Sequence, residues 1–111
     1  MEEIVKRIRQ RLGEPLRIVE INDEQFSGLF EIAKEEWELY STLSNLESTT
    51  LSNIKNYWIN AYFSALSKES LGRIRGKFSG NINGPDGDVK LDYIELLNES
   101  AYEKDRLINL L

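Results

Sequence analysis

Three aspartates around a glycine-rich turn are the first residues whose types and spacing could bind a metal ion. Asp86, Asp88 and Asp92 lie two and four positions apart in this segment. Calcium-binding loops use oxygen ligands near such turns, but here Glu95 and Glu99 are both out of register for the terminal glutamate of the twelve-residue pattern. We therefore expect Asp86 and Asp88 to shape turns, Asp92 to cap a helix, and the protein to bind no metal.

A second candidate is the basic segment 72–77, which reads Gly-Arg-Ile-Arg-Gly-Lys. Its residue types resemble a phosphate-binding loop, but it lacks the P-loop spacing and the Ser or Thr that follows the lysine. Nucleotide chemistry is therefore not expected. Two interpretations stay open: these cations contact an acidic protein surface or DNA phosphate, or they form a solvated helix end that interacts favourably with the helix dipole.

Catalytic constellations are otherwise missing from the sequence. The chain has no histidine and no cysteine, which removes Ser-His, Cys-His and thiolate chemistry. Carboxylates are abundant, but glycosidase-type catalysis needs two of them facing across a cleft, and here they fall on the polar faces of predicted helices. The sequence predicts a protein that is not an enzyme and uses no cofactor.

The elements that position these residues are predicted to be helices. A chain of 111 residues, 41% of them hydrophobic, suits one domain with a packed core. Apolar residues recur at helical spacing over four stretches. These are about 2–13, 23–43, 51–77 and 92–110 within a single domain, 1–111. Two short extended segments, 17–21 and 89–91, could form a small β pair, so the predicted fold class is mainly α.

The third predicted helix is apolar over most of its circumference, which is typical of a central helix. Its candidate packing residues are one tryptophan and two pairs of small residues, each pair four positions apart. They are Trp58, Ala61, Ala65, Gly72 and Gly76. Small residues let another backbone approach closely, and the sequence leaves open whether that backbone belongs to the same subunit or to a neighbour.

Charge alternates along the chain between basic and acidic stretches, with a net charge of −5. The second basic stretch supplies candidate contacts to a neighbouring subunit or to DNA: Lys68, Arg73, Arg75 and Lys77. Alternatively, the charged faces pair within one subunit. No apolar run approaches the ~20 residues that a membrane span needs, and residues 1–11 lack the apolar core of a signal peptide. We expect synthesis in the cytoplasm and no membrane partner.

Several motifs together resemble a known family. Residues 8–15 read Ile-Arg-Gln-Arg-Leu-Gly-Glu-Pro and lead through Val-Glu-Ile to Asp-Glu-Gln-Phe at 23–26. Residues 65–78 read Ala-Leu-Ser-Lys-Glu-Ser-Leu-Gly-Arg-Ile-Arg-Gly-Lys-Phe, and Gly-Pro-Asp-Gly-Asp-Val follows at 84–89. With the closing helix, these segments resemble the neck, or head–tail connector, structural proteins of contractile-tailed bacteriophages.

The resemblance implies a virion protein, made in the bacterial host cytoplasm, that forms a ring between the portal and the tail. Its partners would be copies of itself, portal and tail or neck proteins, with nonspecific contact to packaged DNA. Reversing the charges of Arg73 and Arg75 would then block assembly and leave helicity intact. Two alternatives remain: a small regulatory protein-binding module, and another tail or baseplate component.

Overall fold

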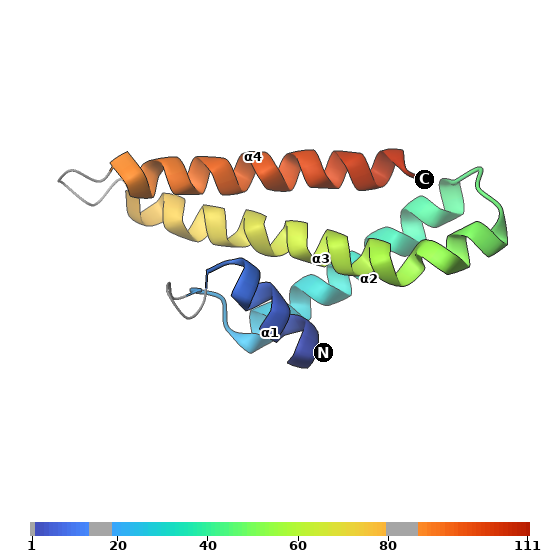
Figure 1. Ribbon diagram of the computed structural model, residues 1–111, viewed down its shortest axis with the longest axis horizontal. Helices are drawn as coiled ribbons and strands as arrows, with labels where there is room; N and C mark the ends of the chain where they lie inside the picture. The colour runs from blue at the N-terminus through green and yellow to red at the C-terminus, as the bar shows by residue number, and fades with distance from the viewer. Residues whose placement is uncertain (1, 14–18, 80–86) are drawn as a thin grey trace.

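Four helices follow one another along the part of the chain that the structure describes. The computed structural model describes residues 2–13, 19–79 and 87–111 (Figure 1). The helices are α1 (Glu2–Arg11), α2 (Asp23–Leu43), α3 (Ser48–Ser79) and α4 (Gly87–Asn109). The predicted mainly α class with four helices is confirmed. The third and fourth helices begin earlier than the sequence indicated, at Ser48 and Gly87.

The predicted β pair is wrong for the described residues. Residues 89–91 lie inside α4, and residues 19–22 form no strand; residues 17 and 18 lie outside the described part of the chain. The β propensity of three residues does not outweigh the hydrogen bonds of the 23-residue helix that contains them. Asp92 is likewise within α4 and does not cap it, while Asp86 lies outside the described residues.

The third helix is the element around which the others pack. It contacts α1, α2 and α4, and its partnership with α4 is the most extensive. Figure 1 shows α3 and α4 side by side and antiparallel along the long axis, with α2 passing behind α3 and α1 below it. The molecule measures 53 × 26 × 19 Å, so the α3–α4 pair sets its length.

The core is built from aromatic rings centred on Trp58, which is fully buried. Its ring stacks on Tyr62 at 4.8 Å and lies 5.5 Å from Trp37. Burial raises the pKa of Tyr62 to about 12, so its phenol stays protonated at neutral pH. The Trp58 indole N–H also donates to the carbonyl of Leu107 at 2.8 Å. That carbonyl is in the last turn of α4, where helices lack internal donors, so Trp58 joins α3 to the end of α4.

Two glycines of α3 set how closely α4 approaches. A Cβ placed on Gly72 would lie 3.1 Å from the Leu97 side chain, and one on Gly76 would lie 3.2 Å from the Tyr93 ring. Ala65 is fully buried and Ala61 is partly buried. At Gly72 and Gly76 the close approach is therefore made by a helix of the same subunit.

This packing predicts opposite effects for two glycine substitutions. We expect Gly72→Leu to lower the free energy of unfolding by about 1–2 kcal/mol, because overpacking costs about 1–3 kcal/mol and exceeds the ~1 kcal/mol that helix propensity returns. We expect Gly28→Ala to raise it by about 0.5–1 kcal/mol, since a Cβ there meets nothing within 4 Å. Urea unfolding followed by circular dichroism measures both. An unchanged stability for Gly72→Leu would contradict the close α3–α4 contact.

Candidate protein-interaction surfaces

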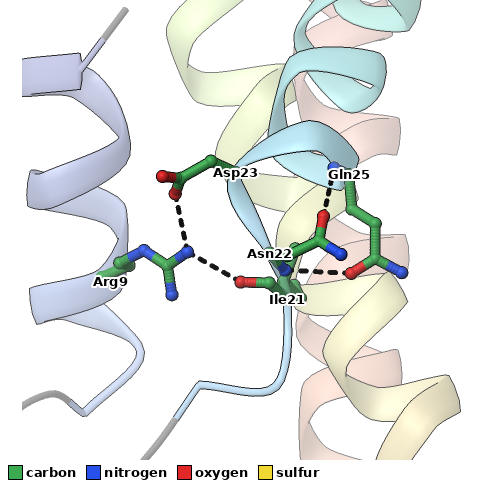
Figure 2. Close-up of polar contacts among 5 residues, drawn as sticks. All are labelled: Arg9, Ile21, Asn22, Asp23 and Gln25. Carbon is green, nitrogen blue, oxygen red and sulfur yellow. Dashed lines mark hydrogen bonds and ion pairs between the residues drawn. The ribbon is translucent and has the colours of Figure 1, made fainter.

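Arg9 holds α1 against the start of α2. Its Nη2 atom donates to the Ile21 carbonyl at 2.8 Å and to Asp23 Oδ1 at 2.9 Å, as Figure 2 shows. Its guanidinium also lies 4.8 Å from the centre of the Phe26 ring. Val5 and Ile8 on the same helix are buried in the core. The other cations of α1, which are Lys6, Arg7 and Arg11, are exposed.

A capping box fixes where α2 begins. The Asn22 side chain accepts from the Gln25 backbone N–H at 2.7 Å, and the Gln25 side chain accepts from the Asn22 backbone N–H at 2.9 Å (Figure 2). The N-cap is therefore Asn22, and the capping box satisfies donors that a helix start leaves without internal partners.

Two of the four predicted contact cations are engaged inside the subunit. Lys68 Nζ lies 2.6 Å from Glu103 and 3.4 Å from Glu99, both on α4. Burial alone would lower the pKa of Lys68, but the hydrogen bond and charge of Glu103, with those of Glu99, raise it overall. Arg75 is 6% exposed, and its Nε lies 3.2 Å from Glu20. These two cations tie α3 to α4 and to the segment before α2.

Arg73 is the predicted contact residue that faces solvent. Its side chain is 69% exposed and lies 3.3 Å from Glu69, one helical turn earlier. Such an exposed pair contributes little to stability. The side chain of Lys77 lies outside the described residues. The basic stretch that the sequence presented as one motif is thus divided among different faces of α3.

A groove opens beside α3 between α1 and α4. It consists of two adjoining pockets of about 410 and 210 Å³ that share Arg11, Tyr57 and Ala61. Its lining residues are Ile4, Arg7, Ile8, Arg11, Leu12, Tyr57, Asn60, Ala61, Ser64, Lys68, Arg75, Leu96, Glu99, Glu103, Arg106 and Leu107. We call it the basic groove.

The basic groove carries positive charge that its own acids do not neutralise. Within the described part of the chain, Arg7, Arg11 and Arg106 make no ion pair, and the Arg106 side chain donates a hydrogen bond to the Tyr57 hydroxyl at 3.3 Å. Sequence reasoning missed this site, because the three groove cations that make no ion pair among the described residues, Arg7, Arg11 and Arg106, come from the first and last helices. The spacing of residues within one helix cannot show that cations from two different helices lie in the same groove.

An acidic stripe runs along the outer face of α2. Its members are Glu24, Glu31, Glu35 and Glu38, all exposed, which recur at spacings of three, four and seven. Glu31 pairs with Lys34 at 2.8 Å; the other three make no ion pair among the described residues. Ile32 and Leu39 flank the stripe and are 41% and 53% exposed. The stripe thus presents negative charge beside exposed apolar side chains.

Two other classes of site find no support in the part of the chain that the structure describes. It contains no group of three or more acidic, histidine or cysteine side chains placed to hold a metal ion. None of the described helices combines the length and apolar character that a bilayer crossing requires.

A family model described as bacteriophage T4 neck protein gp13 matches residues 30–111, from the second turn of α2 to the last residue of the sequence. The chain belongs to the bacteriophage T4 neck protein gp13 family. The predicted resemblance to neck proteins of contractile-tailed phages is thereby confirmed. As a member of the gp13 neck protein family, the protein is a structural component of the virion. No curated protein and no solved structure matches the chain.

The gp13 match covers α3, α4 and most of α2, and it leaves α1 outside. The acidic stripe from Glu31 onward therefore lies within the matched segment. Arg7 and Arg11 of the basic groove lie before it. The family match therefore does not cover the part of the basic groove that α1 contributes.

Proposed function

We propose that this neck protein is a non-catalytic subunit of a ring in the head–tail connector, between the portal and the tail. In this role it contacts copies of itself, the portal and other tail or neck proteins, and it uses no cofactor. The observation that carries the proposal is the family match over residues 30–111. A chain without histidine or cysteine is compatible with a purely structural role.

The distribution of surface charge supports contacts between copies. The basic groove and the acidic stripe lie on different helices of one chain and are largely unneutralised within it. Surfaces of opposite sign on one subunit suit a structure that repeats around an axis. Arg73, exposed on α3, is the described member of the predicted set that remains available for a neighbour or for DNA phosphate.

Quantitative mass spectrometry of purified particles tests the proposal. We expect a copy number equal to that of the portal protein or a simple fraction of it, because connector rings stack on the portal axis. Portal-defective particles that lack a neck serve as the control and should lack this chain. Absence from complete particles would overturn the virion role and favour the regulatory binding module.

A further inference from the structure

The basic groove and the acidic stripe match each other in charge and in apolar content. The groove presents Arg7, Arg11 and Arg106 around a floor that includes Tyr57 and Ala61. The stripe presents glutamates beside the exposed side chains of Ile32 and Leu39. The groove is positively charged and the stripe is negatively charged. Charge complementarity therefore favours the stripe as the surface that occupies the groove.

The two surfaces lie on opposite sides of the molecule. Phe63 of α3 packs edge-on against Phe26 and Phe30 of α2, so this side of α3 faces α2. Ala61, in the groove, is two positions earlier, which places it about 200° around the helix axis. The stripe lies on the face of α2 away from its buried residues Phe26 and Ala33. An α2 stripe therefore cannot reach the groove of its own subunit.

We infer that the basic groove of one copy receives the acidic stripe on α2 of a second copy. The inference rests on the proposed ring function, because its occupant is another copy of the same chain. Complementary surfaces on opposite faces form a head-to-tail contact, in which each copy offers its groove to one neighbour and its stripe to the other. Such contacts generate a ring when the rotation between copies closes.

Crosslinking in purified particles tests the contact in the assembled state. The chain has no cysteine, so introduced cysteines are its only thiols. Asn60→Cys lies in the groove and Leu39→Cys beside the stripe, both exposed, and together they leave every charge unchanged. We expect a short bis-maleimide to link the double variant into a ladder of multimers. Each single variant is a matched control and should remain monomeric.

Each result decides between the two proposals. Normal copy number without a ladder would overturn the groove–stripe contact and leave the connector role intact. Dimers from Leu39→Cys alone would also overturn it, because they would show α2 facing α2. Absence of the unsubstituted chain from particles would overturn the connector role itself.

Charge reversal gives an independent test in the full chain. We expect Arg7→Glu with Arg11→Glu, and separately Glu35→Lys with Glu38→Lys, to lower incorporation into particles at least about tenfold, because like charges then face each other. The variant that carries all four substitutions restores complementarity at every contact and should regain incorporation. Failure of this rescue, with monomer helicity unchanged, would overturn the inference.

A matched control tests whether the acidic contact is made by α2 or by α4, which also carries exposed acidic residues. Glu95→Lys with Asp105→Lys makes the same change in net charge at exposed positions on α4. We expect this variant to incorporate normally. A loss equal to that of the stripe variant would move the acidic contact to α4 and contradict the proposed role of α2.

Discussion

Replacing Trp58 with alanine is expected to lower the free energy of unfolding by about 3–5 kcal/mol. Trp58 is fully buried, and its ring stacks on Tyr62. The substitution leaves a large cavity at the point where α2, α3 and α4 meet. It also removes the indole donor from the Leu107 carbonyl, which then lacks its cross-helix partner at the end of α4. Because small domains are stable by only about 5–15 kcal/mol, this loss is a large fraction of the total.

Urea unfolding followed by far-ultraviolet circular dichroism measures this effect. The matched control is Tyr57→Ala, one position earlier on α3, where the side chain is 55% exposed. We expect the control to cost less than about 1 kcal/mol. Equal losses for the two variants would contradict the central position of Trp58 in the core.

The second large effect is expected from Arg75→Glu, which should lower the free energy of unfolding by at least about 3 kcal/mol. Arg75 is 6% exposed and pairs with Glu20 at 3.2 Å. Glutamate at this position buries a carboxylate beside Glu20, whose side chain is 40% exposed, so the new charge loses solvation and is repelled by Glu20. The chain would lose the connection between α3 and the segment before α2.

Arg73→Glu is the control, and we expect it to change the stability by about 0.5 kcal/mol or less, since the side chain is exposed. Thermal unfolding of both variants at neutral pH distinguishes them. Similar melting temperatures would contradict the burial of Arg75. The comparison also revises the expectation that reversing Arg73 and Arg75 together leaves helicity intact. We expect reversal of Arg73 alone to leave the fold intact, and reversal of Arg73 and Arg75 together to disturb it, because Arg75 is buried.

Helical spacing predicted most of the fold because the apolar stripes are long. Phe26, Ala33 and Trp37 mark the buried face of α2, and all three are in the core. Gly72 and Gly76 indicated a close backbone approach, and α4 makes that approach. The short segment 89–91 was predicted as extended and is helical, because three residues carry too little periodicity to separate a strand from a helical turn.

The surfaces were harder to predict because they depend on how the helices pack. Arg73 and Arg75 are two positions apart in one basic motif, yet one side chain is exposed and the other is buried. Conversely, Arg11 and Arg106 are distant in the sequence and line one pocket. Linear charge patterning shows that basic residues are present. Their neutralisation by Glu20, Glu99 or Glu103 depends on tertiary contacts that no spacing reveals.

Because both tryptophans lie in the core, their fluorescence can be used to follow folding. Trp37 and Trp58 are the only two in the chain, and their rings lie 5.5 Å apart in the core. Neither residue lies in the basic groove or on the acidic stripe. Tryptophan fluorescence therefore reports on the α2–α3–α4 core, and we expect docking at either surface to change it little. Folding and assembly can thus be followed by separate signals in one sample, without attaching a dye to the core.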